Sequence, residues 1–271
     1  TKDHTQKIWL PGTFGQTMSI IGVISMKGGV GKTSTTANLA SAMAAKLGAG
    51  RVSALDLDPQ NALHWHLGFQ DIQSRGVCEQ SLMDADWREI TLTHNATVRC
   101  LPYGDVSEPD REAFESLLAQ HPTWIGSQLQ RGALSQDAVV LIDTPPGPSV
   151  YLKQVFDCAD LILIILLSDA GSYATIPSME AWIEEMPAGP QGRQVFYVLN
   201  QVDRSEPLNR DTATFLHQQL KNRMCPIEIH NDEAVGEALA FQQTVVEYEP
   251  HGQASIDLAR LATWVINTLY K

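Results

Sequence analysis

The residues with the clearest chemical meaning form one short run near the start of the chain, K-G-G-V-G-K-T-S. Glycines in such a run let the backbone turn tightly and point several N–H groups inward, which makes an anion site where a helix begins. Lys32 can reach the β- and γ-phosphates of a nucleotide, and the Thr33 hydroxyl is placed to bind Mg²⁺. The sequence therefore predicts a nucleotide triphosphate site formed by consecutive residues: Lys27, Gly28, Gly29, Val30, Gly31, Lys32, Thr33 and Ser34.

Carboxylates follow two later apolar runs. Asp56 and Asp58 stand in A-L-D-L-D-P-Q-N, and Asp143 opens D-T-P-P-G. Because side chains alternate along a strand, Asp56 and Asp58 share one side, where two carboxylates repel each other unless a cation lies between them. A Mg²⁺ ion bound to phosphate would supply that cation. The three carboxylates are therefore candidate parts of the same metal and phosphate site.

A residue that reads the base is expected where N-Q-V-D ends a further apolar run. The Asn200 side chain offers both a donor and an acceptor to the edge of a base. The pattern is close to the guanine-reading N-K-x-D, with Gln201 in place of the lysine. Because Asp203 is present in this pattern, GTP stays as an alternative ligand, while ATP is the main prediction.

The elements that must position these residues are apparent from periodicity. Short runs rich in Val, Ile and Leu are typical of strands buried on both faces. They are expected at 19–25, 52–57, 98–102, 139–143, 161–167, 195–200 and 226–229. Helical spacing predicts helices at 33–47, 112–119, 150–158, 176–185 and 209–221. This alternation predicts a doubly wound α/β fold, with a mainly parallel sheet covered by helices on both faces and ligands beyond the carboxyl ends of the strands.

Composition and length limit the classes of protein. Thirty-one acidic residues against nineteen basic ones give a net charge of −12, which disfavours binding to nucleic acid. The four cysteines form no C-x-x-C pair, and no apolar run is long enough to span a bilayer. We therefore expect a cytoplasmic protein. Without a repeat or dividing linker, residues 18–271 are expected to form a single P-loop ATPase domain, preceded by an N-terminal extension at 1–17.

One departure from the usual phosphate-binding loop indicates a family. That loop begins with glycine where this chain has Met26, and Lys27 follows. The pattern K-G-G-x-G-K-[ST] resembles the deviant loop of the ParA/MinD family of P-loop ATPases. This resemblance implies Mg²⁺ and ATP as cofactors, and an ATP-dependent homodimer in which Lys27 reaches the phosphates of the other subunit.

The same resemblance implies roles for the residues at the strand ends. D-x-D-P-Q is similar to the first switch of the family and D-T-P-P-G to the second. Asp58 would then orient or deprotonate the attacking water, Asp56 would support the metal through water, and Asp143 would hold a Mg²⁺-bound water. Asn200 would contact adenine, with His230 in a loop nearby. The implied enzyme is a slow, dimer-dependent ATP hydrolase with Lys27, Lys32 and Asp58 in catalytic roles.

The branch of the family is indicated by residues outside the nucleotide site. Partition ATPases of the ParA type need a basic surface for DNA, yet beyond Arg223 this chain offers only Arg260 and Lys271. MinD proteins end in a basic amphipathic helix that binds membrane. Here 255–270 has few cations, so we expect it to pack on the core.

Four segments instead resemble bacterial cellulose biosynthesis proteins of the BcsQ family: L-M-D-A-D-W-R-E, L-P-Y-G, H-N-D-E-A-V-G-E-A-L-A and V-V-E-Y. That resemblance implies an ATP switch that assembles or positions the inner-membrane cellulose synthase complex. The protein would reach the membrane only through partner proteins. A partition ATPase, a MinD-like positioning ATPase and a scaffold that holds nucleotide without hydrolysing it stay as alternatives.

Two histidines, His64 and His66, flank Trp65 just beyond the first switch. Metal binding is one interpretation. An exposed helix beside the switch is the interpretation we favour from the sequence.

Overall fold

The sheet predicted from the sequence is present. The computed structural model describes residues 18–70, 75–94, 97–131, 134, 139–186, 189–190 and 192–270, so the expectation for residues 1–17 lies outside the described part. Within it, a seven-stranded sheet has the order β3-β4-β2-β5-β1-β6-β7. The strands are β1 (Ser19–Ile24), β2 (Val52–Asp56), β3 (Leu92–His94), β4 (Val98–Leu101), β5 (Val139–Asp143), β6 (Leu161–Leu167) and β7 (Gln194–Asn200). Neighbouring strands are parallel except at the edge pair β3 and β4. The prediction of a mainly parallel sheet is therefore confirmed.

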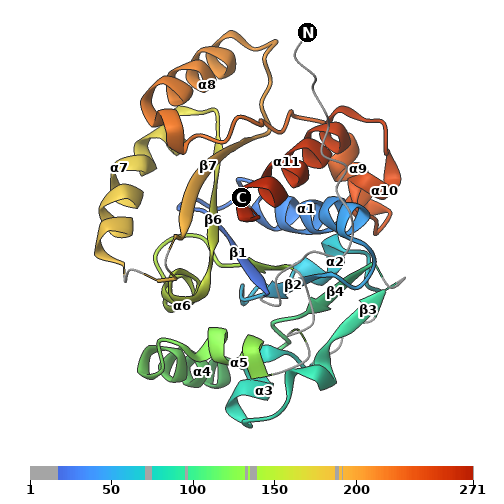
Figure 1. Cartoon of the computed structure of the whole chain (residues 1–271), viewed down its shortest axis with the longest axis vertical. Helices are drawn as coiled ribbons and strands as arrows, with labels where there is room; N and C mark the ends of the chain where they lie inside the picture. Colours follow the sequence, from blue (N-terminus) through green and yellow to red (C-terminus); the bar gives the residue numbers. More distant parts are fainter. Residues whose placement is uncertain are drawn as a thin grey trace, which may run out of the picture.

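Helices cover both faces of this sheet (Figure 1). One face carries α1 (Lys32–Leu47), α2 (Leu63–His66), α9 (Ala234–Ala240), α10 (Val245–Tyr248) and α11 (Gln253–Leu269). The other carries α3 (Val77–Leu82), α4 (Glu108–Gln120), α5 (Trp124–Arg131), α6 (Val150–Cys158), α7 (Ala170–Glu185) and α8 (Pro207–Leu220), with 3₁₀ turns at Trp87–Ile90 and Lys221–Arg223. The doubly wound α/β prediction is confirmed.

Strand β1 shows how the sequence alternation builds the two hydrophobic layers. Ile21 and Val23 belong to the cluster beneath α1 and α11, while Ile20 and Ile24 belong to the cluster on the opposite face. Between them, a Cβ on Gly22 would lie 2.3 Å from Val155 Cγ1 on α6. Glycine is therefore needed there, because α6 packs directly on the β1 backbone.

The prediction of a strand at 226–229 is wrong. This segment runs beside β7, where the Cys225 N–H donates to the Tyr197 carbonyl over 2.8 Å and the Ile229 N–H to the Leu199 carbonyl over 2.9 Å. Only isolated bridges result, on either side of Pro226. Proline has no N–H to donate, so a continuous ladder does not form.

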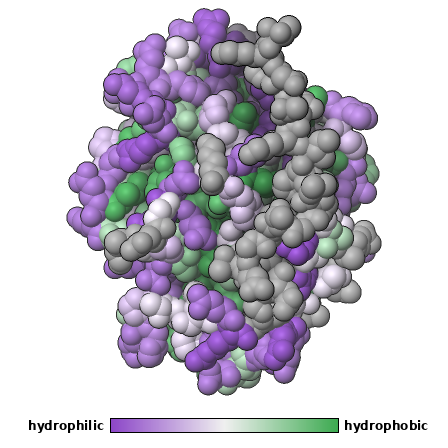
Figure 2. Space-filling model, in the orientation of Figure 1, coloured by the Kyte–Doolittle hydropathy of each residue, from purple (hydrophilic) through white to green (hydrophobic). Residues whose placement is uncertain are grey.

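The C-terminal helix packs on the core, as predicted. Leu258, Leu261 and Val265 of α11 are buried in the cluster that also holds α1, although Ile256 is 44% exposed. None of the helices in the described ranges has the length and apolar character to cross a bilayer. Figure 2 shows hydrophilic side chains around most of the outline in that view, with smaller apolar areas toward the middle.

Candidate functional site

The loop between β1 and α1 forms the floor of the site. Gly29 and Gly31 adopt left-handed conformations, with φ of 75° and 79°. Gly31 directly precedes α1, and among the described residues no side chain caps the first N–H groups of that helix. A cavity of ≈ 320 Å³ lies over the loop. Its lining comprises the whole run from Lys27 to Ser34, together with Ser25, Asp58, Gln60, His66 and Pro146. The N–H groups at the start of α1 thus face a space that an anion can enter.

Two of the predicted site residues that line this cavity, Lys32 and Thr33, contact a third, the fully buried Asp143. Lys32 Nζ lies 2.8 Å from Asp143 Oδ1, and Thr33 Oγ1 donates to Asp143 Oδ2 over 2.7 Å. Thr36, one turn further along α1, donates to Asp143 Oδ1 over 3.2 Å. Sequence reasoning missed this hydroxyl. The available signal was its spacing of three residues from Thr33, which places both side chains on the same side of a helix. The carboxyl end of β5 and the start of α1 are therefore joined through Asp143.

Asp56, at the end of β2, accepts hydrogen bonds from the segment that follows it. Its Oδ1 accepts the Asp58 N–H over 2.9 Å and its Oδ2 accepts the Leu63 N–H over 3.0 Å. Burial raises the pKa of Asp56 well above its usual value, and the neighbouring Asp143 carboxylate raises it further. The hydrogen bond from the Leu63 N–H to Asp56 thus fixes the start of α2.

The Asp58 carboxylate lines the phosphate-side cavity. Its Oδ2 lies 4.0 Å from Lys32 Nζ, and its Oδ1 accepts the Gln60 N–H over 2.9 Å. Burial raises the pKa of Asp58, while the Gln60 N–H and the Lys32 charge partly offset that rise. A carboxylate with a raised pKa accepts a proton more readily, which is the property that a general base needs.

Lys27 is paired with a residue that sequence reasoning missed. Lys27 Nζ lies 2.9 Å from Asp169 Oδ2, and the two side chains are 41% and 39% exposed. Asp169 also caps α7, because its Oδ1 accepts the Ser172 N–H over 2.6 Å. Asp169 follows strand β6 closely. Inspection of every strand end, including that of β6, would have found it.

A second cavity, of ≈ 610 Å³, adjoins the phosphate-side cavity. It is lined by α1, the loop after β7 and much of the segment 229–239. The two cavities share Gly31, Ser34 and His66 as lining residues. Together they suit an elongated ligand with an anionic end and a larger, less charged end.

Asn200 lies in this second cavity, directly against the glycine-rich loop. Its Nδ2 donates to the Val30 carbonyl over 2.8 Å. A Cβ on Gly31 would lie 2.5 Å from Asn200 Nδ2. Glycine is therefore required at position 31 both for its left-handed φ and for this close approach.

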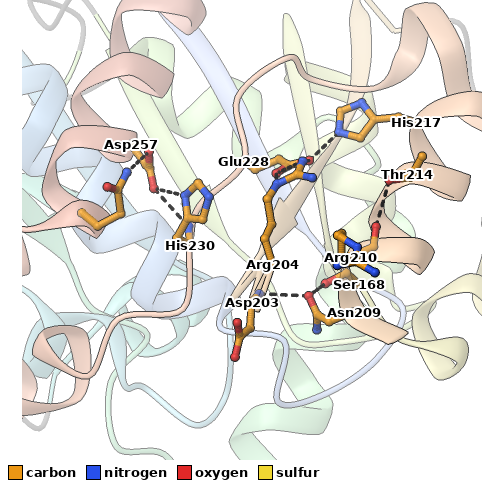
Figure 3. A network of polar contacts seen from close by, with 11 residues as sticks. Ser168, Asp203, Arg204, Asn209, Arg210, Thr214, His217, Glu228, His230 and Asp257 are labelled. Atoms are coloured by element: carbon orange, nitrogen blue, oxygen red, sulfur yellow. Dashed lines mark hydrogen bonds and ion pairs between the residues drawn. The ribbon is translucent and has the colours of Figure 1, made fainter. Parts of the chain in front are cut away.

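His230 also lines the second cavity, whereas Asp203 does not. The His230 ring faces α11, where its Nδ1 lies 2.7 Å from Asp257 Oδ2 (Figure 3). Asp203 Oδ1 accepts the Ser205 N–H over 2.8 Å and the Ser205 hydroxyl over 2.6 Å. In Figure 3 the Asp203 side chain points away from His230. The carboxylate that guanine recognition would need is thus directed elsewhere.

The expectation of an exposed helix is wrong for His64, which is 3% exposed. Its neighbour Leu63 and the following Leu67 belong to the hydrophobic core, which draws this side of α2 inward. His66 instead lines both cavities. Burial lowers the pKa of His66, with Asp143 opposing and Lys32 adding to that effect. Among the described residues, no three His, Cys, Asp or Glu side chains are grouped so that they alone could hold a metal ion.

Comparison with known proteins identifies the family. The family model for the cellulose biosynthesis protein BcsQ matches residues 18–266. BcsQ of Salmonella typhimurium is 28% identical over 256 residues, covering 92% of this chain and 94% of that protein. The chromosome partitioning protein ParA of Caulobacter vibrioides is 26% identical over 259 residues, covering 90% and 93%. The septum site-determining protein MinD of Pyrococcus horikoshii, in complex with Mg-ADP, has a similar structure, with a TM-score of 0.73 at 20% identity and coverage of 92% and 96%. Because the family model spans nearly the whole described chain, this protein belongs to the BcsQ family of cellulose biosynthesis proteins.

Proposed function

We propose that this chain is a Mg²⁺-dependent ATPase whose ATP-bound form is a homodimer, and that it acts in bacterial cellulose synthesis. The observation that carries the proposal is the meeting of Lys32, Thr33 and Asp143 at the uncapped start of α1. ATP is favoured over GTP because the Asp203 carboxylate is turned toward Ser205 rather than into the base-side cavity. The MinD structure that shares this fold contains Mg-ADP.

The residues present fit a Mg²⁺ ion. Mg²⁺ prefers oxygen ligands and keeps several of its waters. The Thr33 hydroxyl would bind the ion, and Asp143, to which that hydroxyl now donates over 2.7 Å, would hold one of its waters. Asp56 would support the metal through a further water, because a carboxylate oxygen can accept a second hydrogen bond beside a backbone N–H. A bound Mg²⁺ would offset the charge of the β- and γ-phosphates.

The protein groups divide the remaining tasks among them. Lys32 would turn from Asp143 to the phosphate oxygens, and the N–H groups of the loop would bind the β-phosphate. Asp58 would orient the attacking water or take its proton, in keeping with its raised pKa and its position on the cavity wall. Lys27 would leave Asp169 and reach the phosphates of the other subunit. Cationic side chains on the phosphates, Mg²⁺ and a residue that positions the attacking water recur in sites of phosphoryl transfer. We expect slow turnover.

Membership of the BcsQ family supports a role in assembling or positioning the inner-membrane cellulose synthase complex. We propose that the protein resides in the cytoplasm and is recruited to the membrane face by partner proteins. Affinity capture from the native cell tests this part of the proposal. Recovery of cellulose synthase subunits is expected, and recovery of a centromere-binding protein in their place would contradict it.

The switch itself is tested by size-exclusion chromatography with light scattering in the presence of Mg²⁺ and ATP. Asp58→Ala should give a stable ATP-bound dimer, because hydrolysis no longer opens it. Lys27→Ala should bind ATP and stay monomeric, and Lys32→Ala should lose nucleotide binding. An Asp58→Ala protein that binds ATP but remains monomeric would contradict the scheme.

Two rival functions give different results. A partition ATPase would retain DNA in a gel shift at low salt. The net charge of −12 disfavours that rival, and Arg223 is already paired with Glu180. A scaffold that never hydrolyses ATP would release phosphate no faster than Asp58→Ala does.

A further inference from the structure

His66 lies where the two cavities of the site meet. The residues that line both cavities are Gly31, Ser34 and His66. Gly31 and Ser34 belong to the glycine-rich loop and the first turn of α1. His66 is the last residue of α2, in the segment that follows Asp58. Among the described residues, it is therefore the shared lining residue that approaches the cavities from outside the phosphate-binding loop and α1.

The position of His66 is fixed from both ends of α2. At the start of the helix, the fully buried Leu63 donates its N–H to Asp56 Oδ2 over 3.0 Å. Just beyond its end, Gly68 has a φ of 83°, and a Cβ there would lie 2.5 Å from the Gln242 carbonyl oxygen, between α9 and α10. The helix is thus held against the core at both ends. The ring of His66 is placed before any ligand arrives.

The imidazole is available to a ligand. Among the described residues, no hydrogen bond or ion pair involves the His66 ring, in contrast to His230, whose ring is paired with Asp257. A neutral imidazole has one N–H donor and one acceptor nitrogen. Within the described part of the chain, the ring can therefore donate to a phosphate oxygen without breaking a hydrogen bond or an ion pair.

We infer that His66 binds the α-phosphate of the nucleotide, at the joint between its polyphosphate and its nucleoside. This inference rests on the proposed nucleotide function. The α-phosphate is the group that must lie where the phosphate-side and base-side cavities meet. Both ADP and ATP carry it, so His66 contributes to the affinity for both nucleotides. Its contact also links the Asp56-anchored helix α2 to nucleotide occupancy, before and after hydrolysis.

Isothermal titration calorimetry with Mg-ADP and Mg-ATP tests the inference. His66→Ala should weaken both nucleotides by a similar factor of roughly ten, the effect of one hydrogen bond to a charged group. His66→Gln keeps a donor and should lose less. The control is His251→Ala, which removes an exposed histidine that lines neither cavity. The melting temperature of the nucleotide-free protein should change little in all three variants, because the His66 ring has no hydrogen bond or ion pair to lose within the described part of the chain.

A second readout separates contact from a structural role. In ¹⁵N-histidine spectra, the imidazole signals that disappear in His66→Gln should shift in the wild type when ADP is added. Wild-type nucleotide affinity in His66→Ala, or a loss for ATP alone, would overturn the inference. So would an affinity loss matched by a lower melting temperature without nucleotide. If the wild-type protein bound neither nucleotide, the proposed function itself would fail.

Discussion

The ion pair between Lys27 and Asp169 leads to a quantitative prediction about dimer strength. In the isolated chain, Lys27 Nζ lies 2.9 Å from Asp169 Oδ2. If Lys27 acts on the phosphates of the other subunit, it must first leave this partner. Asp169→Asn removes the charge that holds Lys27 and keeps the cap of α7, because Asn and Asp cap helices about equally well. We therefore expect Asp169→Asn to strengthen the ATP-dependent dimer.

The size of the effect follows from the exposure of the pair. Side chains that are 41% and 39% exposed form a surface ion pair, and such pairs contribute about 0.2–1 kcal/mol. A dimer must break two of them, at a cost of about 0.4–2 kcal/mol in all. Because 1.4 kcal/mol corresponds to a tenfold change, the dimer dissociation constant should fall roughly 2- to 30-fold.

Sedimentation velocity over a concentration series, with Mg²⁺ and ATP, measures this constant. An Asp58→Ala background prevents hydrolysis during the run. The control is Asp211→Asn, which removes a carboxylate from the exposed Arg210–Asp211 pair on α8 and should leave the constant unchanged. The gain from Asp169→Asn should shrink at high salt, because salt screens surface pairs. A dimer that is unchanged or weaker in Asp169→Asn would refute the reasoning.

Three further predictions concern packing and pH. Gly31→Ala should lose at least roughly tenfold in ATP affinity by calorimetry, with unchanged far-UV circular dichroism, because a Cβ would meet Asn200 Nδ2 at 2.5 Å at a position with φ of 79°. Gly22→Ala should lower the free energy of unfolding in urea by about 1–3 kcal/mol, because its Cβ would lie 2.3 Å from Val155 Cγ1. In the Gly22→Ala background, Val155→Ala should lower the free energy of unfolding by less than it does in the wild type, because it removes the clashing atom. Burial lowers the pKa of His64, so below pH 6.5 the unfolded chain binds a proton that the folded chain does not, and stability falls as the pH falls. His64→Leu should therefore lose less free energy of unfolding between pH 7 and pH 5 than the wild type does.

The sequence predicts the parts of the site that are local or lie at strand ends. The loop from Lys27 to Ser34 is continuous, so its glycine spacing suffices to predict the anion site. Asp143 and Asn200 lie far from it in sequence, yet each follows an apolar run. In a parallel sheet these ends meet at one edge, so their meeting could be predicted from the fold class.

The rest of the site depends on tertiary contacts that periodicity does not specify. Asp169 could be found from its place after β6, but its pairing with Lys27 depends on how α7 starts. Nothing in the local pattern around His66 indicates that Asp56 holds α2 over the phosphate-binding loop. The burial of His64 follows from core packing on the same helix. The strand predicted at 226–229 was wrong because an apolar run containing Pro226 can be extended without forming a ladder.

The central claim is that the loop before α1 binds a nucleoside triphosphate through Lys32. Isothermal titration calorimetry with Mg-ATP, and with Mg-GTP for the wild type, tests it directly. The proteins are the wild type, Lys32→Ala and Lys46→Ala, which removes an exposed lysine from the last turn of the same helix. We expect saturable binding of Mg-ATP by the wild type and by Lys46→Ala, and none by Lys32→Ala. Absence of binding by the wild type to both ATP and GTP, or equal binding by wild type and Lys32→Ala, would contradict it.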